Sequence, residues 1–182
     1  MLLSMRAEIR NLTIASLLAA LTAVLSMVAI PLPGSPVPLT GQTLGVMLAG
    51  ALLGPWWGSA SMLAYLGIGF LGFPVFSGGK AGFATLAGPT GGYLLGFVLG
   101  AWATGALSRY MRGRYYALAC TVGGVVVVHV LGTVWLASQT GRTWQEAFFL
   151  GSAPFLAGDM VKVVLASFLC SRLRPTGPRS SR

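Results

Sequence analysis

Asp159 and Lys162 place opposite charges three residues apart inside the last long hydrophobic stretch of the chain, which runs from about residue 153 to 171. Positions i and i+3 lie on one face of a helix, so a helical conformation brings the two side chains together. Ionisable groups in an apolar membrane segment are costly and usually face a protein interior or a cavity. The pair is therefore either a structural ion pair or a ligand site that offers an acceptor beside a donor.

The composition predicts that a membrane surrounds this pair. Of the 182 residues, 55% are hydrophobic and only 8% are charged, which is typical of an integral membrane protein. We expect an all-α protein with a single membrane domain over residues 1–182, in which residues 1–11 form a cytoplasmic head and 172–182 a cytoplasmic basic tail. Six transmembrane helices are predicted, over residues 12–30, 43–54, 55–72, 91–109, 115–138 and 153–171.

Two segments rich in proline and glycine, residues 31–42 and 73–90, interrupt these helices. The first carries four prolines within eight residues and cannot be helical, and the apolar run after it has only 12 residues, about 18 Å as a helix. Irregular backbone at membrane depth is tolerated where it is buried or lines a cavity. We therefore expect the two loops to cap a site, with Gln42 as a polar contact and the glycines up to Gly91 allowing close backbone approach.

The cations are distributed unevenly along the predicted topology. Lys80 and Arg142 fall on one side and Lys162 lies within a helix, whereas nine arginines fall on the side of the two termini: Arg6, Arg10, Arg109, Arg112, Arg114, Arg172, Arg174, Arg179 and Arg182. This positive-inside bias predicts that both termini are cytoplasmic and that the loops capping the site face outward. It also accounts for the net charge of +9 without a nucleic-acid partner.

Small residues recur every four positions in the first predicted helix, at Ala15, Ala19 and Ala23. Such a stripe lets another helix approach closely. It serves either packing within the chain or docking of a partner subunit, and the spacing alone does not separate these alternatives.

Three motifs follow one another along the chain. They are Pro36-Val37-Pro38-Leu39-Thr40-Gly41-Gln42-Thr43, then Gly78-Gly79 with Gly88-Pro89-Thr90-Gly91-Gly92-Tyr93-Leu94, and last Gly158-Asp159-Met160-Val161-Lys162. Together they resemble the BioY family of biotin transporters. The resemblance implies a substrate-binding S component of an energy-coupling factor (ECF) transporter, with six membrane helices and a biotin site near the outer surface. It also implies a T component and two ATPases as partners, and it makes the alanine stripe similar to a docking motif for the T component.

Biotin suits the side chains that the sequence supplies. Its ureido ring has two N–H donors, for which Asp159 is an acceptor, and one carbonyl acceptor, to which Lys162 or a loop N–H can donate. The apolar ring and chain of biotin need a hydrophobic wall, for which Phe73, Phe76, Tyr93 and Val75 are candidates. Lys80 is the candidate partner of its carboxylate. Gly91 and Gln42 complete the predicted site.

The same residues bear on other classes of function. An enzyme is not expected, because the lone His129 has no nucleophile motif nearby and is predicted to be a packed or hydrogen-bonded core residue. No cofactor or metal is expected, and Pro74 and Ala81 break the pattern of a phosphate-binding loop around Lys80. An S component for a different vitamin, an autonomous secondary carrier, and self-association of the chain stay open alternatives.

Overall fold

The structure, a computed structural model, describes residues 2–111 and 113–173 and is built almost entirely of helices. Arg112 and residues 174–182, which include most of the predicted basic tail, lie outside the described residues. The α-helices are α1 (Leu2–Met27), α2 (Gln42–Leu53), α3 (Pro55–Phe70), α4 (Ala84–Ala87), α5 (Gly91–Ser108), α6 (Tyr116–Cys120), α7 (Val128–Thr140), α8 (Trp144–Gly151) and α9 (Leu156–Leu173). Three 3₁₀ turns, η1 (Ser77–Gly79), η2 (Gly113–Tyr115) and η4 (Ala153–Phe155), a π-helix, η3 (Thr121–Val127), and two short strands, β1 (Ala29–Ile30) and β2 (Leu39–Thr40), complete the fold.

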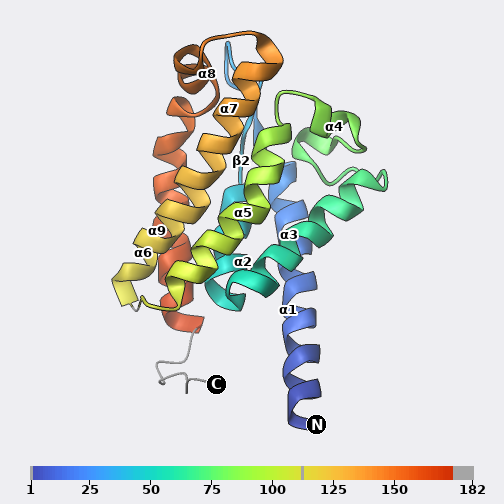
Figure 1. Cartoon of the computed structure of the whole chain (residues 1–182), viewed down its shortest axis with the longest axis vertical. Helices are drawn as coiled ribbons and strands as arrows, with labels where there is room; N and C mark the ends of the chain where they lie inside the picture. The colour runs from blue at the N-terminus through green and yellow to red at the C-terminus, as the bar shows by residue number, and fades with distance from the viewer. Residues whose placement is uncertain (1, 112, 174–182) are drawn as a thin grey trace.

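The long helices run side by side and place the two irregular segments at one end of the molecule (Figure 1). The start of α1 and the end of α9 lie at the opposite end, whereas α4 and α8 lie with the loops. Strands β1 and β2 form an antiparallel pair that brackets the proline-rich segment, with Ala29 opposite Thr40. Residues far apart in the sequence therefore meet at the loop end.

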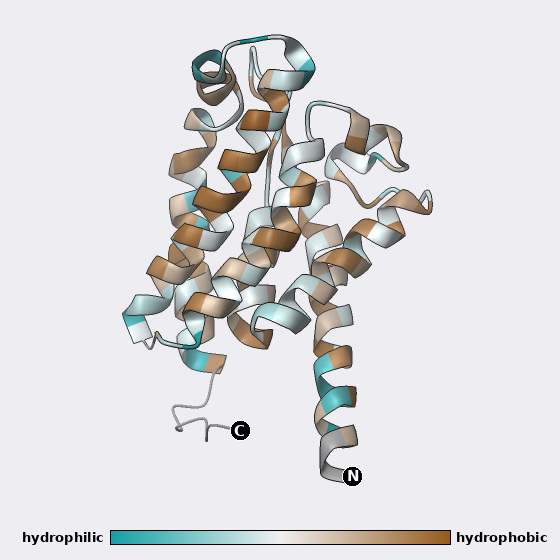
Figure 2. Cartoon of the chain, in the orientation of Figure 1, coloured by the Kyte–Doolittle hydropathy of each residue, from teal (hydrophilic) through white to brown (hydrophobic). Residues whose placement is uncertain are grey.

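Four helical stretches among the described residues are long and apolar enough to cross a membrane: Met5–Met27, Gly91–Ser108, Gly113–Thr140 and Trp144–Leu173. Hydrophobic residues dominate the middle of the molecule, and hydrophilic ones gather toward its two ends (Figure 2). Large apolar side chains on the long helices also point outward. Leu17 on α1 is 63% exposed, and Val164 on α9 is 66% exposed. An apolar outer surface of this kind is expected of a protein whose solvent is lipid.

Helix α1 differs from its prediction at both ends. It begins at Leu2 instead of residue 12, since the head contains helix-forming residues and neither proline nor glycine. It ends at Met27 instead of residue 30, because Ala29 and Ile30 pair with β2 ahead of Pro31. The predicted head is thus helical over its described residues, and the helix is 26 residues long.

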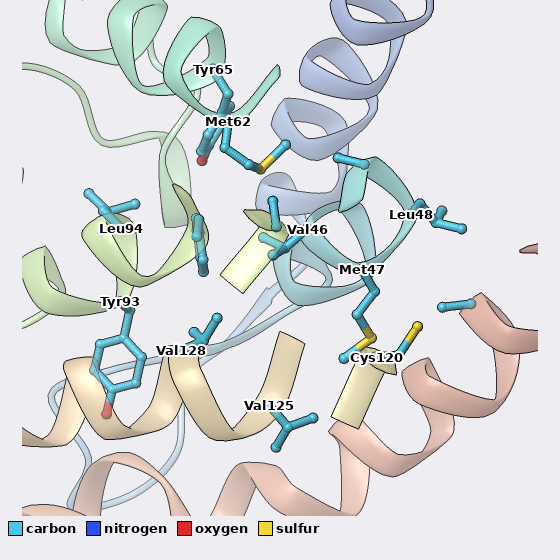
Figure 3. Close-up of a cluster of buried hydrophobic side chains, with 14 of the residues drawn as sticks. Val46, Met47, Leu48, Met62, Tyr65, Tyr93, Leu94, Cys120, Val125 and Val128 are labelled. Atoms are coloured by element: carbon cyan, nitrogen blue, oxygen red, sulfur yellow. The ribbon is translucent and has the colours of Figure 1, made fainter. Parts of the chain in front are cut away.

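Helix α5 lies at the centre and uses glycines to approach its neighbours. A Cβ at Gly96 would meet the backbone of Val128, and one at Gly100 would meet the Gly123 carbonyl and the Val128 side chain. In membranes, lipid supplies no hydrophobic driving force for helix association, and small residues promote it by letting the backbones approach closely. The core around this contact joins side chains of α2, α3, α5 and the α6–η3–α7 unit, including Met47, Met62 and Val128 (Figure 3).

Candidate functional site

Asp159 is the centre of the candidate site. It lies in the first turn of α9, which follows the proline-containing turn η4, and only 1% of its surface is exposed. Its Oδ1 accepts hydrogen bonds from Lys162 Nζ at 2.8 Å and Thr43 Oγ1 at 2.8 Å, and its Oδ2 lies 2.6 Å from His129 Nε2. A helix N-terminus favours a negative charge. The buried carboxylate is therefore held by donors from α2, α7 and α9.

Lys162 is bound entirely within the protein. Its ammonium group donates to Asp159 Oδ1, to Thr43 Oγ1 at 3.0 Å and to the Thr40 carbonyl at 2.6 Å. An ammonium group has three N–H donors, so all of them are used. The predicted contact between Asp159 and Lys162 is confirmed, and it is one part of a network that reaches into the proline-rich segment.

His129 extends the network to the far side of Asp159. Its Nδ1 lies 2.9 Å from Ser152 Oγ, which in turn lies 2.7 Å from Thr133 Oγ1. The prediction that His129 is a hydrogen-bonded core residue is confirmed, with 7% of its surface exposed. Its bond to Asp159 was not predicted.

A second polar network joins the two irregular segments. Gln42 Oε1 accepts from Thr40 Oγ1 at 2.8 Å, and Gln42 Nε2 donates to Tyr65 Oη at 2.5 Å. Tyr65 then donates to the Val75 carbonyl at 2.9 Å, and Ser26 Oγ lies 2.6 Å from the same carbonyl. Gln42 therefore ties the segment that precedes α2 to the one that follows α3.

A pocket lies between these networks. Asp159, Lys162 and His129 contribute charged and polar groups to its lining, and both irregular segments contribute residues to it. Its lining residues are Val37, Pro38, Leu39, Thr40, Gln42, Thr43, Phe76, Ser77, Lys80, Thr85, Thr90, Tyr93, Leu94, Phe97, Val128, His129, Phe155, Asp159 and Lys162. Apolar walls with a few convergent polar groups are characteristic of small-molecule sites.

Most of the predicted site residues meet at this pocket. Its lining includes Asp159, Lys162, Gln42, Tyr93, Lys80 and Phe76. Phe76 is 1% exposed and makes an edge contact with the Tyr65 ring. Tyr93 donates to the Gly151 carbonyl at 2.5 Å, and its ring fills the space that a Cβ on Gly132 would need.

The pocket lining includes neither of the wall candidates Phe73 and Val75, and it also lacks the predicted site residue Gly91. A Cβ at this position would meet the Leu86 carbonyl and the Trp135 indole nitrogen. The glycine therefore permits close packing of the segment around α4 against α5 and α7, and the adjacent Thr90 lines the pocket instead.

Ser77 is a pocket residue that the sequence did not single out. Its hydroxyl is buried, and it is one of two buried side-chain polar atoms in the described part of the chain that have no hydrogen-bond partner; the other is Thr104 Oγ1. A buried polar atom without a partner is rare and calls for an explanation. Because Ser77 lines the pocket, a bound ligand is a natural partner for it.

The alanine stripe of α1 faces inward in this structure. Ala15 and Ala19 are 5% and 3% exposed, and Ala23 is partly buried against the core. The Ala15 carbonyl accepts from Ser61 Oγ of α3 at 2.7 Å. Packing within the chain therefore occupies the stripe here, and its docking to a partner stays a prediction.

Comparison with known proteins supports the resemblance seen in the sequence. The model of the BioY family matches residues 3–179. The chain is 38% identical over 170 residues to the biotin transporter BioY of Rhizobium etli, which covers 88% of this chain and 90% of the relative. It is also 38% identical over 184 residues to the biotin transporter BioY of Rhodobacter capsulatus, with 93% and 95% covered.

A solved structure has the same fold. The S-component for biotin from an ECF-type ABC transporter superimposes with a TM-score of 0.88 and 28% sequence identity, and the match covers 94% of each chain. The family model spans nearly the whole sequence, and the relatives match along almost their full length. The chain belongs to the BioY family.

Proposed function

We propose that this chain binds biotin and serves as the substrate-binding S component of an ECF transporter in the cytoplasmic membrane. The observation that carries the proposal is the pocket in which an acceptor, Asp159, and a donor, Lys162, lie together under two irregular segments. The names of the relatives and of the solved structure support biotin as the ligand. A T component and ATPase subunits supply the energy, and this chain performs no catalysis and needs no cofactor of its own.

The topology of the proposal follows the sequence. Six spans, with α2 and α3 as two short ones, keep both termini on the cytoplasmic side and turn the pocket outward. The separation of the start of α1 and the end of α9 from the loop end in Figure 1 supports this orientation. So does the count of arginines, nine of which fall in the segments on the side of the termini.

Binding of biotin requires an exchange of partners, since Lys162 has no free donor. The ureido carbonyl of biotin replaces the Thr40 carbonyl on Lys162, and a ureido N–H donates to the unused lone pair of Asp159 Oδ2. Phe76, Tyr93 and Phe97 contact the apolar parts of biotin, and Lys80 at the exposed rim meets its carboxylate. The exchange breaks the hydrogen bond from Lys162 of α9 to the Thr40 carbonyl. Binding therefore changes how the segment that contains Thr40 covers the pocket.

Binding of radiolabelled biotin to the purified chain tests the proposal. We expect saturable binding at submicromolar concentration, competed by unlabelled biotin and not by riboflavin or thiamine. Absence of binding at these concentrations would refute the assignment, and competition by another vitamin would indicate an S component of different specificity. Efficient, ATP-independent uptake by cells that express this chain without an ATPase would favour the autonomous carrier.

Replacing Ser77 with alanine is expected to weaken biotin binding by about 5- to 10-fold, the effect of losing one neutral hydrogen bond. The thermal stability of the empty protein should be unchanged or slightly higher, because the hydroxyl has no partner to lose. Equilibrium binding and thermal unfolding of the same preparation check both parts. A matched control is Ser59→Ala, since Ser59 donates to the Val98 carbonyl and is not a lining residue; equal affinity losses in both variants would rule out a ligand contact for Ser77.

A further inference from the structure

The hydrogen bonds of Asp159 divide unequally between its two oxygens. Lys162 and Thr43 both donate to Oδ1, whereas His129 alone approaches Oδ2, at 2.6 Å. A carboxylate has about four acceptor positions, two on each oxygen. One acceptor position, on Oδ2, is therefore left for a ligand. The contact with His129 sets the direction of the lone pair at that position.

The proton positions around His129 follow from its partners. Asp159 already accepts two hydrogen bonds as a carboxylate, so His129 Nε2 carries the proton and donates to it. When the ring is neutral, Nδ1 is an acceptor and Ser152 donates to it; when the ring is protonated, Nδ1 donates to Ser152, and Nε2 donates to Asp159 in both forms. With the neutral ring, Thr133 donates to Ser152, and the hydrogen bonds run in one direction from Thr133 through Ser152 and His129 to Asp159.

The orientation of the imidazole is fixed by packing as well as by these bonds. Phe155 lies nearly parallel to it at a centroid distance of 6.2 Å, and Tyr93 meets it edge-on at 5.9 Å. Phe155, Tyr93 and His129 come from η4, α5 and α7. Groups held in this way from several elements keep their geometry when a ligand arrives.

On the basis of the proposed biotin function, we propose that His129 is a positioning residue for ligand recognition. It directs the remaining lone pair of Asp159 toward the pocket and so selects a ligand that presents an N–H there. Without the imidazole, Oδ2 has two unused positions, and only the bonds of Lys162 and Thr43 to Oδ1 orient the carboxylate. The ligand then meets a carboxylate whose direction is no longer set.

Two variants at position 129 test this role by equilibrium binding of radiolabelled biotin. His129→Leu removes the donor and is expected to weaken binding by about 10- to 100-fold, the range for a hydrogen bond to a charged group. His129→Gln retains an N–H that can reach Asp159 and an oxygen that can accept from Ser152, so it should restore affinity to within about 3-fold of wild type. Equal affinity of His129→Leu and wild type would overturn the proposal, as would equal losses in both variants.

A spectroscopic measurement on the unaltered protein covers the case in which a variant does not fold. His129 is the single histidine of the chain, so ¹⁵N labelling of histidine gives one imidazole to observe, provided that no polyhistidine tag remains. We expect the Nε2–H tautomer in the empty protein and a shift of the Nε2 signal when biotin binds. An Nδ1–H tautomer, or signals that biotin leaves unchanged, would contradict the proposal.

Binding by wild type and binding by His129→Leu separate the proposed function from the role of His129. If wild-type protein binds no biotin, the proposed function is wrong. If wild type binds biotin and His129→Leu binds it equally well, the function stands and the role of His129 is wrong.

Discussion

Asp159→Asn is expected to weaken biotin binding by at least about 100-fold. Three donors converge on this carboxylate, from Lys162, Thr43 and His129. An asparagine amide has only one acceptor oxygen and would turn its NH₂ group toward at least one of these donors. It also leaves the charge of Lys162 unpaired inside the protein, and breaking a buried pair in this way costs about 3–5 kcal/mol.

Glu8→Gln is the matched control, since it makes the same chemical change at an exposed position on α1. We expect it to bind biotin like wild type. The measurement is equilibrium binding of radiolabelled biotin, with uptake into cells that contain the full transporter as a second readout. Wild-type affinity and uptake in Asp159→Asn would show that the pair with Lys162 has only a structural role.

Gly123→Ala is expected to lower the thermal unfolding midpoint of the protein in detergent by about 5 °C or more. A Cβ on this glycine of η3 would overlap the Thr104 hydroxyl and the Thr104 backbone nitrogen of α5. Backbone atoms cannot rotate away, so α5 and η3 must separate, and overpacking of this kind typically costs about 1–3 kcal/mol. The separation would also loosen the core shown in Figure 3, which supports the pocket.

Gly67→Ala provides the comparison for this effect. Gly67 lies within α3, and a Cβ there meets no atom within 4 Å. Alanine is favoured over glycine inside a helix by about 0.5–1 kcal/mol, so this variant should match or slightly exceed wild-type stability. If both variants unfold at the wild-type temperature, the close contact between α5 and η3 is not needed for stability.

The sequence predicted those parts of the site that depend on short-range spacing or on composition. Asp159 and Lys162 share one helix, so their separation alone predicts their contact. The prolines and glycines of residues 31–42 and 73–90 predicted irregular backbone, and both segments line the pocket. These features need no knowledge of how the helices are rotated against one another.

The link between His129 and Asp159 depends on that rotation and could not be predicted. Between the start of the fifth apolar stretch and His129 lies the seven-residue π-helix Thr121–Val127. A π-helix changes the number of residues per turn, so it shifts which face of α7 points to α9. Nothing in the run Thr-Val-Gly-Gly-Val-Val-Val distinguishes a π-helix from an α-helix by hydrophobic period. Ser77 was missed for a related reason, because whether a serine hydroxyl is buried depends on the path of the loop around it.

The full use of the three N–H donors of Lys162 has a consequence for the passage of ions. A fixed charge with free donors inside a membrane protein attracts water, and a file of water conducts protons. In the structure described here, each N–H of the Lys162 ammonium already has a protein partner and its charge is balanced by Asp159. An ion that entered would have to displace these partners, and each elementary charge crossing the membrane dissipates about 2.3 kcal/mol per 100 mV of potential. We therefore expect the paired charges of Asp159 and Lys162 to oppose the passage of ions through the chain.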